Sequence, residues 1–145
     1  MSPRLIPEGV LAVLTVWMEA RGEPPEGRAA VAEVIRNRTE QRFQSDGTLV
    51  GTLFHPYAFS CWNTKDAQRV VALKLLEDSP LIAECREAWG TALGGSNYGL
   101  GAVSYFNPAV VVPDWAETMV MTAEIGRHRF YKSFMAVIDE GSRRA

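Results

Sequence analysis

The sequence predicts an α+β fold in which helices come first and a small antiparallel sheet lies near the C-terminus. Apolar residues recur at helical spacing from about residue 7 to 38, and again over 64–77 and 80–93. After Gly99 the pattern changes to β-prone stretches that Pro108, Pro113 and Gly126 interrupt. These two observations place the helices before the strands.

Length and composition indicate one globular domain over residues 1–145. Apolar residues make up 47% of the chain and charged residues 22%, which suits a single core. The net charge is −2 without a basic cluster, so no nucleic-acid partner is expected. The longest apolar run, VLAVLTVWM at 10–18, is too short to cross a bilayer, so no membrane insertion is expected either. We expect a monomer.

The first two helices are bounded by prolines. The first is expected to start at Pro7, because proline suits a first helical turn, and to stop at Gly22 and the Pro24–Pro25 pair. Its apolar residues cover most of its circumference, which predicts a buried helix: Val10, Leu11, Val13, Leu14, Trp17 and Met18. The second should run from about Pro25 to Arg38 and present a small Ala/Val face for close packing.

The rest of the chain is read from its turn signals. SDGT at 45–48 predicts a turn, and FHPYAFSCWN at 54–63 an aromatic-rich loop within an irregular stretch over 39–63. Helices are expected over 64–77 and 80–93, and GGSN ends the second. TMVMTAEIGRHRFYK, at 118–132, predicts a hairpin that turns near Gly126.

Glu19 is the residue best suited to acid chemistry. A carboxylate at a helix C-terminus faces the negative end of the helix dipole, and Trp17 and Met18 make its surroundings apolar. Both effects disfavour ionisation, and glycosidic cleavage requires an acid that keeps its proton. The alternative is a solvated glutamate at a helix end. A capping role at the second helix would explain Glu23.

The cysteines and histidines do not predict a cofactor. No HExxH or CxxC spacing joins His55, His128, Cys61 and Cys85, so neither a metal nor another cofactor is expected. Without a recognisable signal peptide, the two thiols should be reduced. A cysteine peptidase would use Cys61 and His128, but a nucleophilic cysteine usually begins a helix, whereas Asn63 is better placed to cap the next one.

A longer motif resembles a known family. EARGEPPEGRAAVAEVIRNR, at 19–38, resembles the opening motif of the SleB/CwlJ-type cell-wall hydrolases, which comprise spore cortex-lytic enzymes and related phage endolysins. FSCWN at 59–63, AVSYFNP at 102–108 and IGRHRFY at 125–131 resemble later elements of the same family, in the same order. The resemblance implies a mainly α-helical lobe like that of lysozymes and lytic transglycosylases. It also implies cleavage of peptidoglycan glycan strands between N-acetylmuramic acid and N-acetylglucosamine.

The resemblance also assigns site residues. Glu19 matches the catalytic glutamate, and SYFNP is similar to the Tyr–Asn element of lytic transglycosylases. Tyr105 would then orient the acid and Asn107 would bind the sugar; the alternatives are a tyrosine packed in the sheet and an asparagine that starts a turn. The remaining expected substrate-binding residues are Glu23, Ser60, Trp62, Asn63 and His128. For Trp62 and His128 a structural role is the alternative.

Mechanism and location follow from the same resemblance. Because no second carboxylate is clearly placed, the favoured route is that of a lytic transglycosylase, in which the C6 hydroxyl of the substrate attacks and a 1,6-anhydro sugar forms. A hydrolytic muramidase that uses Glu23, and a sugar-binding module without activity, are the alternatives. We expect synthesis in a host cytoplasm and action on the wall after release, as in a phage-type endolysin.

Overall fold

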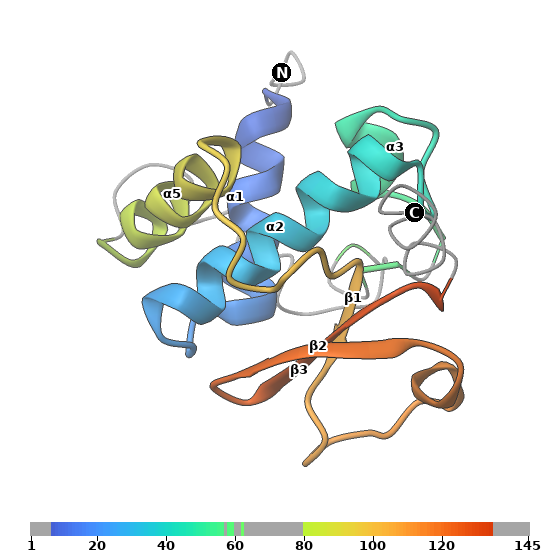
Figure 1. Cartoon of the computed structure of the whole chain (residues 1–145). Coiled ribbons are helices and arrows are strands. Elements are labelled where there is room, and N and C mark those ends of the chain that lie inside the picture. Colours follow the sequence, from blue (N-terminus) through green and yellow to red (C-terminus); the bar gives the residue numbers. More distant parts are fainter. Residues whose placement is uncertain (1–6, 57, 60–61, 63–79, 135–145) are drawn as a thin grey trace.

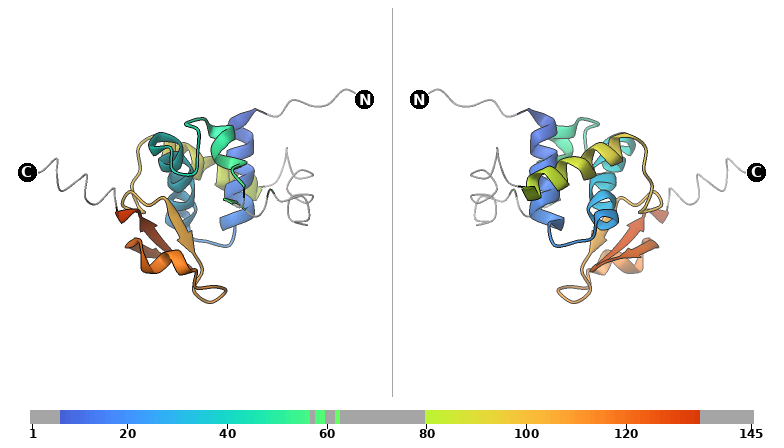
Figure 2. Two further views of the ribbon diagram at one scale, coloured as in Figure 1. Left: turned by 90° about the vertical axis from the view of Figure 1, so that its right-hand side faces the viewer. Right: turned by 90° about the vertical axis from the view of Figure 1, so that its left-hand side faces the viewer.

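The computed structural model describes residues 7–56, 58, 59, 62 and 80–134, which form a helical lobe with a small sheet beside it (Figure 1). Helices α1, α2 and α5 pack on one another, and the strands lie on one side of them in the further views of Figure 2. The predicted α+β class is therefore confirmed, with helices before strands. The helix expected at 64–77 lies outside the described residues.

The first two helices begin where the prolines predict. Helix α1 spans Glu8–Ala20 with Pro7 as its N-cap, and α2 spans Pro25–Gln41 with Pro24 as its N-cap. Every residue of α1 from Ala12 to Met18 is buried, so this helix forms the centre of the lobe as expected. Helix α2 continues past Arg38, and its small residues allow close packing against α1 and α5.

Two shorter features follow α2. The SDGT segment is a turn, but it leads into a short helix, α3 (Leu49–Leu53), within a stretch predicted to be irregular. The hydroxyl of Thr48 accepts the backbone N–H of Gly51 at 2.9 Å, which caps this helix. Helix α5 spans Pro80–Leu93, as predicted.

The sheet has three antiparallel strands in the order β1-β3-β2. Strand β1 is Ser104–Phe106, β2 is Val120–Ile125 and β3 is His128–Lys132. A short 3-10 helix, η2 (Asp114–Glu117), lies between β1 and β2. Strands β2 and β3 form the predicted hairpin, which turns at Gly126 with a φ of 58°.

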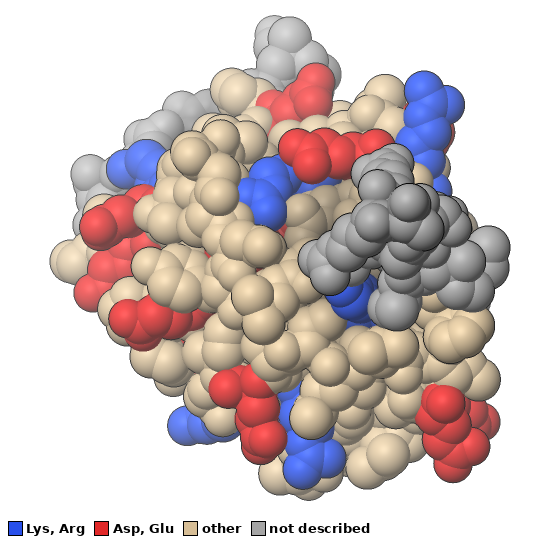
Figure 3. All heavy atoms as spheres, viewed as in Figure 1, with Lys and Arg blue, Asp and Glu red and all other residues tan. Residues whose placement is uncertain are grey.

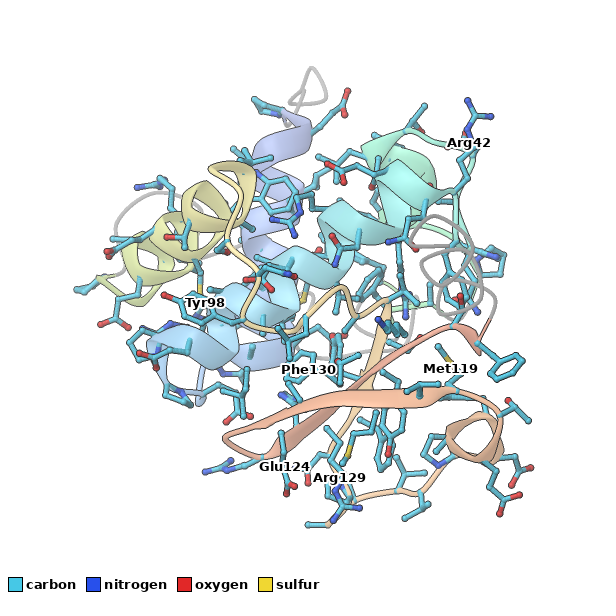
Figure 4. The ribbon with its side chains drawn as sticks, in the orientation of Figure 1. Arg42, Tyr98, Met119, Glu124, Arg129 and Phe130 are labelled. Carbon is cyan, nitrogen blue, oxygen red and sulfur yellow. The ribbon has the colours of Figure 1, made fainter. Side chains whose placement is uncertain are left out.

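Phe130 joins the sheet to the helices. This side chain is fully buried and points from β3 toward α2 (Figure 4). It packs in a cluster of small residues from α1, α2 and the strand-leading loop: Ala20, Ala30, Val31, Val34 and Ala102. A second, larger cluster fills the space among α1, α2, α3 and α5. The sheet is therefore fixed against the α2 side of the helical lobe.

Surface charge and helix length bear on possible partners. On the part of the face in Figure 3 that the structure describes, Lys and Arg side chains are scattered, and acidic side chains gather over α5. Such a face does not present the basic patch of a nucleic-acid-binding protein. Among the described helices, none combines the length and the apolarity needed to cross a membrane.

Candidate active site

Glu19 lies in the last turn of α1 and is partly exposed. All other residues from Ala12 to Ala20 are buried. The chain then leaves the helix at Arg21 and turns toward α2. Helix α1 thus runs through the apolar interior and ends at a cleft, where it places the Glu19 carboxylate, as the sequence predicts.

The cleft is a continuous groove of three adjoining hollows. The central one, of about 450 Å³, lies between the end of α1 and the loop after β1. A smaller hollow of about 110 Å³ shares Glu19, Asn107 and His128 with it. A third, of about 400 Å³, shares Arg38, Ala58, Tyr105 and Trp115 with it and extends to Met119, which precedes β2 (Figure 4). Among the described residues that line the groove, Glu19 and Glu23 are the only carboxylates.

Glu23 connects the α1–α2 corner to the β2–β3 turn. Its Oε1 accepts the backbone N–H of Arg127 at 2.9 Å and lies 2.9 Å from Nδ1 of His128. The second approach does not form a hydrogen bond. The side chain is 5% exposed, and Gly126 packs so closely on it that a Cβ there would lie 3.0 Å from Oε2. Glu23 was predicted to bind substrate. In the structure its carboxylate is bound to the β2–β3 turn, and the residue lines the smaller hollow.

His128 starts β3 and lines the two hollows that meet at Glu19. Burial lowers the pKa of this imidazole, the Glu23 carboxylate raises it and Arg127 lowers it, and the net effect is a pKa below the ordinary value of 6.5. His128 is therefore mainly neutral at neutral pH. A neutral ring can both donate and accept a hydrogen bond at the cleft.

Tyr105 lies where the central and third hollows meet. Its ring packs edge-on against His128 with centroids 5.0 Å apart, and tilted against Phe130 at 5.8 Å. The side chain is half-buried: the ring packs in the sheet, and the residue borders the cleft with Glu19. Its role in orienting the acid stays a prediction.

Asn107 starts a turn and also borders the cleft, while its role in binding the sugar stays a prediction. Its Oδ1 accepts the backbone N–H of Ala109 at 3.0 Å, which fixes the turn after β1. The residue nevertheless lines both hollows that contain Glu19. Because Oδ1 is engaged in the turn, the amide NH₂ is the group left to contact a ligand.

Of the aromatic loop, the structure places Trp62 in the core. Trp62 packs against the larger core cluster and on Phe54, and its indole N–H donates to Oγ1 of Thr15 at 2.8 Å. This is the structural alternative that the sequence left open, and Trp62 does not line the three hollows. Ser60 and Asn63 lie outside the described residues.

Two other residues of the cleft have no role assigned by the sequence. Trp115 in η2 lines the central and third hollows, and its ring meets Phe106 and Tyr131 edge-on at 5.6 and 5.5 Å. A tryptophan two residues after Pro113, in the loop between the predicted strands, is the signal that could have identified it. Arg38, part of the opening motif, is a buried cation that lines the same two hollows.

The structure describes one of the two cysteines that bear on the alternative peptidase function. Cys61 lies outside the described residues, while Cys85 in α5 is free and buried. Burial raises the pKa of the Cys85 thiol to about 11, which makes it a poor nucleophile. Among the residues that the structure describes, no three His, Cys, Asp or Glu side chains gather as metal ligands would.

The chain matches known proteins over most of its length. The family model of the cell wall hydrolases matches residues 22–131. The spore cortex-lytic enzyme of Oceanobacillus iheyensis is 38% identical over 117 residues, and that of Bacillus subtilis is 32% identical over 120. These alignments cover 81% and 83% of this chain but 38% and 36% of the relatives, so the chain spans less than half of their length.

Two solved structures share the fold. The catalytic domain of the germination-specific lytic transglycosylase SleB from Bacillus anthracis superposes with a TM-score of 0.69 at 28% identity, covering 91% of this chain and all of that one. The catalytic domain of Bacillus cereus SleB gives 0.67 at 30% identity, covering 90% and 94%. These neighbours confirm the predicted lysozyme-like architecture. The family match starts three residues after Glu19, so the role of Glu19 rests on its motif and its position.

The match over residues 22–131, the curated relatives and the shared fold agree, and the chain belongs to the cell wall hydrolase family.

Proposed function

We propose that this enzyme cleaves the β-1,4 bond between N-acetylmuramic acid and N-acetylglucosamine as a lytic transglycosylase, with Glu19 as general acid and then general base. One observation carries the proposal. Among the described residues of the cleft, Glu19 is the carboxylate that opens to the groove, while the other, Glu23, is buried and bound to the β2–β3 turn.

The chemistry needs only this one carboxyl group. Protonated Glu19 gives its proton to the glycosidic oxygen as the bond from C1 to that oxygen breaks, and the leaving sugar departs as an alcohol. Positive charge develops on C1 and the ring oxygen. The C6 hydroxyl of the same muramic acid then attacks C1 and releases its proton to the Glu19 carboxylate. The product is a 1,6-anhydro sugar, and Glu19 is again protonated.

The neighbouring side chains suit a sugar ligand. The half-buried ring of Trp115 offers an apolar surface to a pyranose face, and the free amide of Asn107 can bind an N-acetyl or hydroxyl group. Tyr105 and neutral His128 line the central hollow together with Glu19, and there they can orient hydroxyl groups of the sugar. These contacts position the reacting bond, which is where much of such catalysis arises.

A hydrolytic muramidase is the alternative. It would require a second carboxylate that holds and deprotonates a water. Glu23 is the candidate in the groove, but one of its oxygens already accepts from Arg127 and faces His128. Asp114, a further acid near a tryptophan, is exposed in η2 and does not line the groove. The similarity to a solved lytic transglycosylase domain also supports the intramolecular route.

The test compares Glu19→Gln with Glu40→Gln, an exposed glutamate at the end of α2. Loss of a general acid should lower activity on purified peptidoglycan by a factor of roughly 10² to 10⁴ or more, while Glu40→Gln stays active. Mass spectrometry of the wild-type digest should show glycans that end in 1,6-anhydro-N-acetylmuramic acid. Near-normal clearance by a folded Glu19→Gln would overturn the role of Glu19, and reducing ends alone would establish the muramidase.

We further propose the endolysin role that the sequence predicts, in which the enzyme is made in a host cytoplasm and reaches the wall after release. Expression inside a bacterium should then leave the cells intact until the inner membrane is permeabilised. Lysis should follow at once after permeabilisation, and not in cells that express Glu19→Gln. Lysis of wild-type cells without permeabilisation would contradict this order of events.

A further inference from the structure

We propose that Arg38 is a positioning residue for the reaction: its fixed positive charge acts on Glu19 across the cleft and stabilises the carboxylate that Glu19 becomes when it donates its proton. This inference rests on the proposed function of Glu19. It adds a second residue of the opening motif to the machinery, through electrostatics and not through contact with the substrate.

Arg38 is held rigidly on the cleft side of α2. It is 6% exposed, its Nε donates to the backbone carbonyl of Val103, and its Nη2 lies 3.5 Å from Oγ of Ser104. The guanidinium also lies over the rings of Phe59, at 4.9 Å, and Phe43, at 5.7 Å. A charge fixed in this way needs no rearrangement when a negative charge forms nearby.

These contacts do not account for the whole side chain. Nη1 of Arg38 is buried and has no hydrogen-bond partner in the structure. An unsatisfied donor on a buried cation costs stability, so its presence calls for an explanation. A purely structural link between α2 and β1 would require only Nε and Nη2.

The cleft supplies that explanation. Arg38, Glu19 and Tyr105 line the same central hollow, and Arg38 and Tyr105 also line the third hollow. Burial lowers the pKa of Arg38, and electrostatic interactions with Tyr105 and with ionised Glu19 raise it. Because the interaction of two charges is mutual, the guanidinium favours the ionised form of Glu19 to the same degree.

The other charged and titratable side chains that the structure describes around Glu19 do not take this place. His128 on β3 is mainly neutral at neutral pH, and Glu23 at the corner is negative. Arg127 in the turn is exposed at the far end of the smaller hollow. At the C-terminal end of α1, Arg21 stacks on Trp17, with its guanidinium 4.3 Å from the ring centroid. Arg38 is thus the buried cation among the described residues that face the central hollow.

A cation in this position solves a problem of acid strength. The C-terminal end of α1 favours protonated Glu19. The charge of Arg38 opposes this effect and makes Glu19 a stronger acid. Glu19 can then lose its proton to the leaving group and regain it from the C6 hydroxyl with similar ease.

The experiment measures the titration of Glu19 directly. The ¹³C resonance of its side-chain carboxyl group, assigned by its loss in Glu19→Gln, is followed against pH in the free enzyme. Arg38→Gln and Arg38→Met remove the charge, Arg38→Lys keeps it, and Arg36→Gln is the control. Arg36 lies on the same helix and binds the carbonyls of Ala92 and Ser96, away from the groove.

Removal of the charge should raise the Glu19 midpoint by roughly one pH unit and move the alkaline limb of the pH–rate profile in the same direction. Arg38→Lys should shift the midpoint by much less, and Arg36→Gln should leave it unchanged even if it lowers stability. An unchanged midpoint in a folded neutral variant would overturn the proposal, as would a rise in Arg38→Lys equal to that in the neutral variants. The titration needs no substrate, so a failure of the enzyme to cleave peptidoglycan would count against the proposed function alone.

Discussion

Gly126→Ala tests how the hairpin is fixed to the α1–α2 corner. Gly126 has a φ of 58°, where an alanine costs about 1–2 kcal/mol. A Cβ would also lie 3.0 Å from Oε2 of Glu23 and from Cδ of Pro24. Glu23 can move away only by weakening its bond to the N–H of Arg127, which costs roughly another 1–2 kcal/mol. The expected loss in the free energy of unfolding is therefore about 2–4 kcal/mol.

Thermal unfolding followed by circular dichroism measures this loss. An unfolding entropy of about 2.1 cal/mol/K per residue implies that each kcal/mol shifts Tm by about 3 °C in a chain of 145 residues, so Tm should fall by about 6–12 °C. The control is Gly90→Ala, an exposed position in α5 where a Cβ meets nothing within 4 Å. It should raise Tm by about 2–3 °C, because alanine is the better helix former. Equal Tm values for the two variants would refute the reasoning.

Three further predictions concern the cleft and the rival chemistries. Glu23→Gln keeps the shape of the corner but loses its charge, so it should retain more activity than Glu19→Gln and give the same anhydro product; a folded variant as inactive as Glu19→Gln would contradict this. The depressed pKa of His128 means that below about pH 6.5 the unfolded chain binds a proton that the folded chain does not, so this contribution to stability is complete above that pH and is lost as the pH falls. The Tm of His128→Gln should therefore decrease less than that of the wild type between about pH 7 and 5, and parallel curves would count against it. Cys61→Ser and EDTA should each leave most activity; a folded but inactive Cys61→Ser would point to a peptidase, and a loss on chelation that zinc restores would point to an amidase.

The sequence predicted those features that depend on local chemistry. Pro7 and Pro24 mark the helix starts, GGSN ends α5, and Gly126 turns the hairpin, because each acts through its own backbone. The position of Glu19 followed from a periodic signal: one acid at the end of a helix whose other late residues are apolar. The short helix α3 was missed because five residues are too few for a helical period to be recognised.

Features that depend on distant partners could not be predicted in the same way. From the sequence, Trp62 could equally contact a sugar or pack in the core. The hydrogen bond to Thr15 shows that it packs in the core. The position of the Glu23 side chain depends on the backbone N–H of Arg127, and no local sequence pattern indicates such a distant partner. Arg38 is buried in α2 together with Glu33 and Asn37, whereas a cation in a helix is normally predicted to be exposed.

The bond between Glu23 and Arg127 joins residues that lie 104 positions apart in the chain. During synthesis, the helix that carries Glu19 is complete long before β1, β3 and Trp115, which form the opposite wall of the groove, have left the ribosome. A nascent or truncated chain therefore contains Glu19 but lacks the cleft in which it would act. Since the last strand must dock before the groove exists, the fold itself delays activity until translation of the domain is nearly finished.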